Sequence, residues 1–190
     1  MSSYPFACDL ETTGVTAGSC ILSIALVPFH TEYPLDHFYE KISHKLSRDD
    51  GFTDNDETLN WWDKQKPEVQ EEAFSGIRSP EAVLLSLNAY LKAVGDPKEI
   101  YIWGNGKDFD NVILTAAFTK LGLKPYWDFR NNKCYRDLAA HYPYYTKVKP
   151  DIPHHAYYDA LAEAKHAEII FQGILSGLPP IIPGVNDGTL

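Results

Sequence analysis

The sequence predicts an α/β fold: a mixed β-sheet, made of three antiparallel strands followed by parallel α/β units, with helices on its faces. Two patterns lead to this prediction. The first 42 residues contain three strand-like segments, and from residue 79 onward helical patterns alternate with short β-rich runs. The chain has 190 residues, 44% of them hydrophobic, which is enough to bury a sizeable core.

The three N-terminal strands follow from apolar runs with turn residues between them. Residues 4–9 (YPFACD) form a short apolar run that ends in an acid, and residues 20–29 (CILSIALVPF) are rich in Ile, Leu and Val. Residues 35–42 (LDHFYEKI) alternate apolar and polar side chains, as a half-buried strand does. Glycines in the first connection and Pro34 in the second mark tight turns, so consecutive strands are expected to pair antiparallel.

The middle of the chain predicts helices. Residues 54–75 indicate two short helices broken at Pro67, the first opened by an Asp or Asn cap. The tripeptide 79–81 (SPE) supplies a cap, a proline at the first helical position and an acid in the first turn. The helix that it opens is expected to end at Gly95.

The C-terminal half continues the alternation of strands and helices. Residues 99–103 (EIYIW) predict a strand, and residues 108–121 predict a helix. A short strand and a helix are expected within residues 126–142. The last predicted helix covers residues 158–178 and carries an apolar stripe at helical spacing.

Several classes of protein are excluded by composition. No repeat or linker is visible, so residues 1–178 are expected to form one domain, followed by a Pro/Gly-rich tail at 179–190. No run of about 18 apolar residues exists, which excludes a spanning helix and a membrane partner. The N-terminus lacks a secretory signal, and the three cysteines lack zinc-site spacing, so a reduced, cytoplasmic protein is expected.

The first candidate site is the acidic pair Asp9 and Glu11 at the end of the first predicted strand. Residues two apart on a strand project to the same face, so the two carboxylates are expected to lie close together. Their repulsion favours a hard divalent cation between them. The turn formed by Thr12, Thr13 and Gly14 has hydroxyls and amides suited to a substrate end. A solvated strand terminus is the alternative.

Two further clusters lie at helix starts. Residues 103–111 (WGNGKDFDN) join a strand end, a Gly-rich turn and a helix, and match neither a P-loop nor a dinucleotide-binding fingerprint. Asp108 and Asp110 are each explained equally well as partners of the helix dipole. Residues 154–159 (HHAYYD) lead into the last helix, where Asp159 would also serve as a cap.

The order D-x-E, F-D and H-x-x-x-x-D nevertheless resembles the DEDDh family of 3′–5′ exonucleases, which includes polymerase proofreading domains. DLETTG at 9–14, FDN at 109–111 and HHAYYDA at 154–160 match the three motifs of that family. The resemblance covers nearly the whole chain and implies a ribonuclease-H-like fold, with which the predicted order of strands and helices agrees.

The resemblance also implies roles for individual residues. Four carboxylates would hold two divalent metal ions, Mg²⁺ or Mn²⁺: Asp9, Glu11, Asp110 and Asp159. Asp110 is preferred over Asp108 because family members carry F-D at this position. His154, five positions before the last Asp, would be the general base that takes a proton from the attacking water, with His155 as the alternative.

The second motif and a double tryptophan indicate a branch within the family. W-G-N-G-x-x-F-D-N at 103–111 and W-W-x-x-Q at 61–65 are similar to the branch of the polyadenylate-specific exoribonucleases. Trp61, Trp62 and Asn111 are therefore candidates for substrate binding, together with the turn at 12–14. Exposed tryptophans stack on bases. The alternative is that one or both tryptophans only pin their helix to the sheet.

The expected activity is 3′–5′ hydrolysis of phosphodiester bonds in single-stranded nucleic acid with a free 3′ end, RNA before DNA, releasing nucleoside 5′-monophosphates. A single-stranded DNA exonuclease with the same site is the first alternative. An inactive nuclease-fold module that binds nucleic acid, and a metal-dependent phosphatase or nucleotide hydrolase, are alternatives of other classes. Relatives of this branch are often homodimers, so a homodimer is expected.

The net charge of −9 argues at first against a polyanionic ligand. The charges are unevenly spread, however. Residues 120–150 contain seven basic and two acidic side chains, whereas residues 49–81 contain ten acidic and three basic ones. Divalent ions would cancel the four negative charges of the predicted site. Binding of a short single-stranded 3′ end is therefore expected to depend on metal and on the basic segment 120–150.

Overall fold

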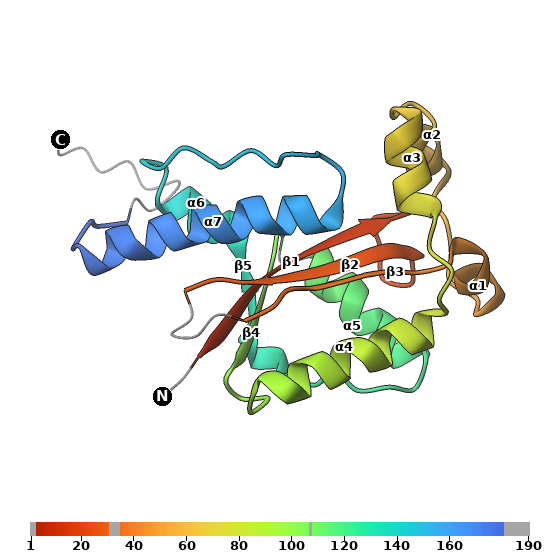
Figure 1. The fold of residues 1–190 in the computed structure, drawn as a ribbon, viewed down its shortest axis with the longest axis horizontal. Coiled ribbons are helices and arrows are strands. Elements are labelled where there is room, and N and C mark those ends of the chain that lie inside the picture. Colours follow the sequence, from red (N-terminus) through yellow and green to blue (C-terminus); the bar gives the residue numbers. More distant parts are fainter. Residues whose placement is uncertain (1–2, 31–34, 107, 181–190) are drawn as a thin grey trace.

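A five-stranded mixed sheet forms the centre of the fold, with the strand order β3-β2-β1-β4-β5 (Figure 1). This computed structural model describes residues 3–30, 35–106 and 108–180. Pro34, Lys107 and the predicted tail from residue 181 onward lie outside the described residues. The sheet and its flanking helices confirm the predicted α/β class.

The strands pair as the sequence predicts. β1 (Tyr4–Thr12) is the central strand, antiparallel to β2 (Ile21–Pro28) and parallel to β4 (Ile100–Gly104). β3 (Phe38–Lys41) lies antiparallel on the outside of β2, and β5 (Asn132–Cys134) lies parallel to β4. β1 continues three residues beyond its predicted end, because its pairing with β2 extends that far.

Seven α-helices and one 3-10 turn are found in the described part of the chain: α1 (His44–Asp49), α2 (Asp56–Trp62), α3 (Pro67–Phe74), α4 (Pro80–Val94), α5 (Asp110–Lys120), η1 (Phe129–Asn131), α6 (Tyr135–His141) and α7 (Ala156–Leu175). Helix α1 was not predicted from the sequence. Helix α5 starts two residues later than predicted, and α7 starts two residues earlier than predicted. Helix caps explain other boundaries: the Ser79 hydroxyl accepts from the Ala82 amide at the start of α4.

Helices cover both faces of the sheet, with α4 and α5 on one side and α6 and α7 on the other (Figure 1). Side chains alternate along β1, so Phe6 joins the core beneath α4 and α5, whereas Ala7 joins the core beneath α7. The contact with α7 is built largely from small residues, among them Ala7, Ala25 and Ala160. Their methyl groups allow α7 to approach the sheet closely. None of the helices described is long and apolar enough to cross a membrane.

We expect Leu87→Ala to lower the free energy of unfolding by about 2–5 kcal/mol, because Leu87 is fully buried between α4 and the sheet. The matched control is Leu85→Ala on the same helix, where the side chain is 48% exposed; its effect should stay within about 0.5 kcal/mol. Denaturant titration measures both variants. Equal losses would contradict the packing of α4 described above.

Candidate active site

Three carboxylates converge where β1 meets the first turn of α7. Asp9 and Glu11 follow Ala7 at two-residue steps along β1, so they project from the face that α7 covers. Asp159 lies in the first turn of α7. One carboxylate oxygen from each of the three residues lies within 4.8 Å of the others. The fold therefore gathers the acids of the first and third sequence motifs in one place.

Asp110, the acid of the second motif, is held at the same site by backbone amides. It is the first residue of α5 and is 1% exposed. Its Oδ1 accepts from the Leu10 amide at 3.3 Å, and its Oδ2 accepts from the Asn105 amide at 2.7 Å. Glycine is required at position 104, since a Cβ there would lie 2.8 Å from the Asp110 Cβ. Asp108 is exposed to solvent.

The two histidines of the third motif face different partners. His154 lines the same cleft as the carboxylates, with its ring centroid 4.8 Å from that of Trp61. Its backbone has a φ of 62°, a left-handed conformation that few non-glycine residues adopt. The His155 ring instead stacks on Tyr39, and its Nε2 lies 3.3 Å from a Glu72 carboxylate oxygen. Only the His155 amide contacts the acidic site, by donating to Asp159 at 3.0 Å.

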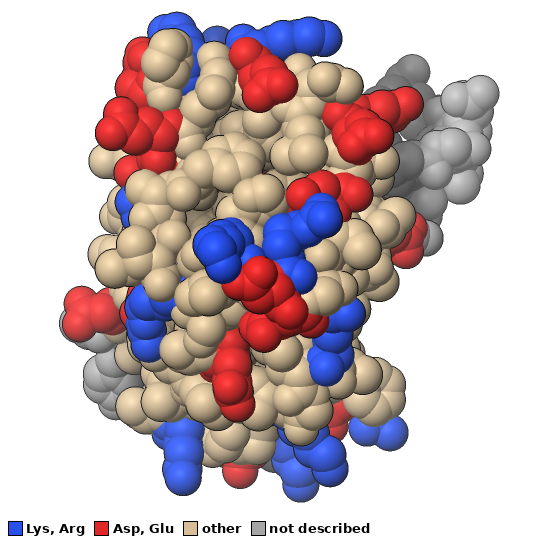
Figure 2. Space-filling model, turned by 90° about the vertical axis from the view of Figure 1, so that its right-hand side faces the viewer, with Lys and Arg blue, Asp and Glu red and all other residues tan. Residues whose placement is uncertain are grey.

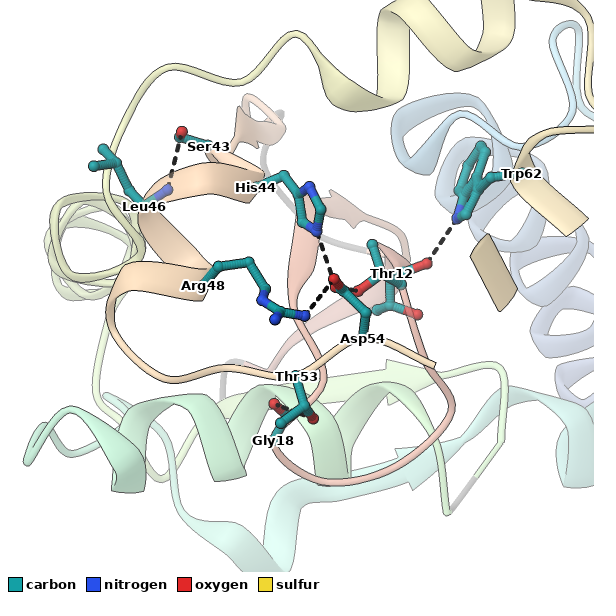
Figure 3. Close-up of polar contacts among 10 residues, drawn as sticks. Thr12, Gly18, Ser43, His44, Leu46, Arg48, Thr53, Asp54 and Trp62 are labelled. Atoms are coloured by element: carbon teal, nitrogen blue, oxygen red, sulfur yellow. Dashed lines mark hydrogen bonds and ion pairs between the residues drawn. The ribbon is translucent and has the colours of Figure 1, made fainter. Parts of the chain in front are cut away.

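The cleft has a volume of about 540 Å³ and is walled on one side by the double tryptophan. Trp61 is 39% exposed, whereas Trp62 is 2% exposed. The Trp62 indole nitrogen donates to the carbonyl of Thr12 at 2.8 Å, which ties α2 to the end of β1 (Figure 3). Trp62 therefore supports the wall, and Trp61 presents its ring to the cleft.

Thr12 also lines the cleft, as the two tryptophans do, but the predicted substrate-binding residues Thr13, Gly14 and Asn111 do not. The Thr13 side chain is fully buried and donates to Asp54 at 2.6 Å. A Cβ at Gly14 would lie 2.5 Å from the Ser19 hydroxyl, so this position is packed inside the turn. The Asn111 amide donates to the Ile102 carbonyl at 3.0 Å and is buried. These three residues therefore support the backbone around the site and do not line the cleft.

Asp54 connects the missed helix α1 to the strand that carries the first acids. Figure 3 shows His44 and Arg48 of α1 pointing toward this carboxylate, with N···O distances of 2.9 and 2.6 Å. Partial burial alone would raise the pKa of Asp54, but hydrogen bonds from Thr13 and His44 outweigh burial and lower that pKa to about 2. Cys20, His44 and Asp54 have metal-ligand atoms within 4.8 Å, yet Arg48 already supplies the positive charge there.

Burial and mutual repulsion dominate the electrostatics of the acidic site. Burial raises the pKa of Asp9 well above its ordinary value, and the charges of Asp110 and Glu11 raise it further. Burial and the neighbouring acids raise the pKa of Glu11 to about 8. For Asp110, burial outweighs the two amide hydrogen bonds and raises the pKa to about 6. Clustered, partly desolvated oxygen ligands of this kind fit hard divalent cations.

A further acid at the site was missed in the sequence analysis. Glu163 lies on α7 one helical turn after Asp159, is 7% exposed and lines the cleft with the other carboxylates. No motif marks it. The only sequence signal is its spacing of four residues from Asp159, which places both side chains on one face of a helix.

The fold and this acidic site are those expected of a 3′–5′ exonuclease of the DEDDh class. The chain belongs to the family described as "3'-5' exoribonuclease Rv2179c-like domain", whose model matches residues 5–171. The resemblance to DEDDh exonucleases and the predicted 3′–5′ exonuclease activity are thereby confirmed. No curated protein sequence matches the chain.

Several solved structures of nucleases have a similar fold. The nuclease domain of 3'hExo, a DEDDh family member bound to rAMP, has a TM-score of 0.59 at 15% identity, over 90% of this chain and 93% of that chain. Cell-death related nuclease 4 (CRN-4) has a TM-score of 0.56 at 12% identity, over 90% of this chain. Exonuclease I from Methylocaldum szegediense has a TM-score of 0.59 at 14% identity, over 92% of this chain. The present chain spans 64% of CRN-4 and 43% of that exonuclease I.

We expect the metal-free protein to become more stable as the pH falls from about 8 to about 5. The pKa of Glu11 is about 8 in the folded protein against 4.5 for the free side chain, and that of Asp110 is about 6 against 3.8. The folded protein therefore holds protons that the unfolded chain has lost over this range, so acidification favours folding. His166, whose pKa burial lowers, acts in the opposite direction within this range, but the larger shifts of Glu11 and Asp110 outweigh it. Asp54 also acts in the opposite direction, but only below about pH 4.

Thermal unfolding in EDTA, followed by circular dichroism from pH 8 to pH 5, measures this effect. Added Mn²⁺ should raise the Tm more at pH 8 than at pH 5, because protons and metal ions compete for the same carboxylates. A Tm at pH 8 that does not respond to Mn²⁺ would contradict a metal centre built from these residues.

Proposed function

We propose that the protein is a 3′–5′ exoribonuclease that removes nucleoside 5′-monophosphates from the free 3′ end of single-stranded RNA. The observation that carries this proposal is the convergence of Asp9, Glu11 and Asp159 within 4.8 Å at a cleft that His154 also lines. The printed description of the matched family as an exoribonuclease domain supports RNA as the substrate.

Four carboxylates would hold two Mg²⁺ or Mn²⁺ ions: Asp9, Glu11, Asp110 and Asp159. Such ions, when bound, lower the pKa of an attacking water and neutralise charge on the phosphodiester and its leaving oxygen. The chain contributes by fixing the ligands in advance. Asp110 is held by two backbone amides, and Asp9 and Glu11 by the central strand of the sheet.

His154 is placed to accept the proton of the attacking water. It is exposed at the mouth of the cleft, so a proton received by its imidazole can pass on to solvent. Trp61 contacts the ring edge-on, at an interplanar angle of 88°. His155, by contrast, pairs with Glu72, which argues against a catalytic role for it.

The charge distribution suits a short strand that enters the cleft. The face that presents α1 to α3 mixes acidic and basic side chains without a large area of one sign (Figure 2). Burial and neighbouring acids raise the pKa of Glu163, and two residues of the basic segment, Lys147 and Arg136, partly oppose that rise. Positive charge from this segment therefore acts on the acidic site. The homodimer stays a prediction.

Two alternatives make different predictions for the same site. A single-stranded DNA exonuclease needs no contact with the 2′-hydroxyl, so it would degrade DNA as fast as RNA. An inactive module would be expected to have lost one of its acids, whereas the four metal-ligand carboxylates and His154 are all present here.

We expect Asp110→Asn to reduce Mn²⁺-dependent degradation of 5′-labelled single-stranded RNA by at least about a thousandfold, because a neutral amide replaces one metal ligand. Asp108→Asn is the matched control: this acid is two residues away and exposed, so its loss should leave the rate unchanged. Denaturing gels with free and blocked 3′ ends, RNA beside matched DNA, give the rate, polarity and sugar preference.

Several outcomes of that assay would overturn the proposal. Full activity of Asp110→Asn would reject the site, and degradation of 3′-blocked RNA at the normal rate would reject the polarity. Equal rates on RNA and DNA would reject the RNA preference. Release of inorganic phosphate in place of nucleoside monophosphates would indicate a phosphatase.

We expect Trp61→Ala to raise the KM for single-stranded RNA by about 5- to 150-fold with little change in kcat, because stacking on one base contributes about 1–3 kcal/mol. Trp61→Phe should restore most of the loss. Phe129→Ala serves as the control, since Phe129 is a 68% exposed aromatic residue outside the cleft. An unchanged KM in Trp61→Ala would show that this indole does not contact the substrate.

A further inference from the structure

Glu163 is a buried acid at the active site with an unused hydrogen-bonding atom. It is 7% exposed and lines the same cleft as Asp9 and Asp159. Its Oε2 is buried and has no hydrogen-bond partner. A carboxylate oxygen taken out of water without a partner is strongly destabilising, so buried carboxylates in native proteins normally have a donor or a cation beside them.

The charges around Glu163 are mainly negative. Burial raises the pKa of Glu163 well above its ordinary value, and the charges of Asp110 and then Asp159 raise it further. Lys147 and Arg136 act in the opposite direction without cancelling these effects. A cation beside the unpartnered Oε2 would offset these like charges.

Asp110 does not belong to the cluster of three acids whose oxygens lie mutually within 4.8 Å. Both of its carboxylate oxygens already accept backbone amides, from Leu10 and Asn105. Glu163, one helical turn after Asp159 on α7, lines the same cleft as the three clustered acids. The carboxylate with an unpartnered oxygen therefore lies at the same cleft as these acids.

We propose that Glu163 is a fifth carboxylate of the metal centre and binds a divalent ion in the cleft. This inference rests on the proposed function, because it assumes the metal centre formed by Asp9, Glu11, Asp110 and Asp159. The cation supplies the partner that Oε2 lacks. It also explains why an acid is tolerated on the buried face of α7, where the neighbouring buried positions include Ala160, Ala164 and Ala167.

The test is a titration of the metal-free protein with Mn²⁺. Electron paramagnetic resonance measures the concentration of unbound Mn²⁺ at each step. Glu163→Gln keeps the shape of the side chain and removes its charge. Its affinity for at least one Mn²⁺ ion should fall by about 10- to 100-fold. Glu168→Gln, the same change at an exposed position of α7, should bind as the unmodified protein does.

Stability in EDTA provides the second measurement. Because the neutral amide in Glu163→Gln cannot repel the neighbouring acids, the Tm of this variant without metal should equal or exceed that of the unmodified protein at pH 8. The rise in Tm on adding Mn²⁺ should be smaller in Glu163→Gln, each protein being compared with its own metal-free baseline. A variant with lower baseline stability is thus still tested for its response to metal.

Asp9→Asn separates this inference from the proposed function. If Asp9→Asn loses Mn²⁺ and Glu163→Gln binds it normally, the metal centre stands and the role of Glu163 is overturned. If neither variant differs from the unmodified protein, the centre itself is wrong. If both lose affinity and Glu168→Gln does not, Glu163 belongs to the centre.

Discussion

Repulsion between carboxylates that are partly out of water is the interaction on which this structure depends. Asp9 and Glu11 project from the central strand of the sheet, and Asp159 meets them from α7. In the absence of cations these groups oppose folding, since burial and like charges both favour their neutral forms. The surrounding structure must hold these carboxylates together against their repulsion. A bound divalent ion would offset the repulsion, so the same arrangement is suited to binding a cation.

The supporting contacts are distributed over the whole fold. Backbone amides at positions 10 and 105 fix Asp110, and the hydrogen bond from Trp62 to Thr12 fixes the end of β1. The Asp54 carboxylate contacts His44 and Arg48 of α1 and accepts a hydrogen bond from Thr13, just after the end of β1 (Figure 3). Helix α1 therefore helps to hold the end of β1 in place. The rigidity of the site thus comes from backbone amides and supporting side chains as well as from the acids themselves.

The sequence was sufficient to predict the sheet, most helices and the acids of the three motifs, because strand periodicity and motif spacing are local properties. It was not sufficient for α1, a six-residue helix stabilised by the Ser43 cap and by ion pairs with distant Asp54. The spacing of the motifs could not show that the side chains of Thr13 and Asn111 are buried away from the cleft, because their orientation depends on tertiary contacts. Glu163 lies four residues after Asp159, a spacing that puts both on one face of a helix, but no family motif marks this position.

The row of alanines between α7 and the sheet has a consequence for metal selectivity. Ala7 precedes Asp9 by two residues on β1, and Ala160 follows Asp159 on α7, so the two ligand-bearing elements are separated by little more than methyl groups. The thickness of that contact sets how far apart the carboxylates of strand and helix can stand. In the proposed metal centre, the ionic radius that is accepted would therefore depend in part on side chains with no affinity for a cation. Exchange of one metal for another could evolve in this fold through changes in methyl-sized packing, with every ligand unchanged.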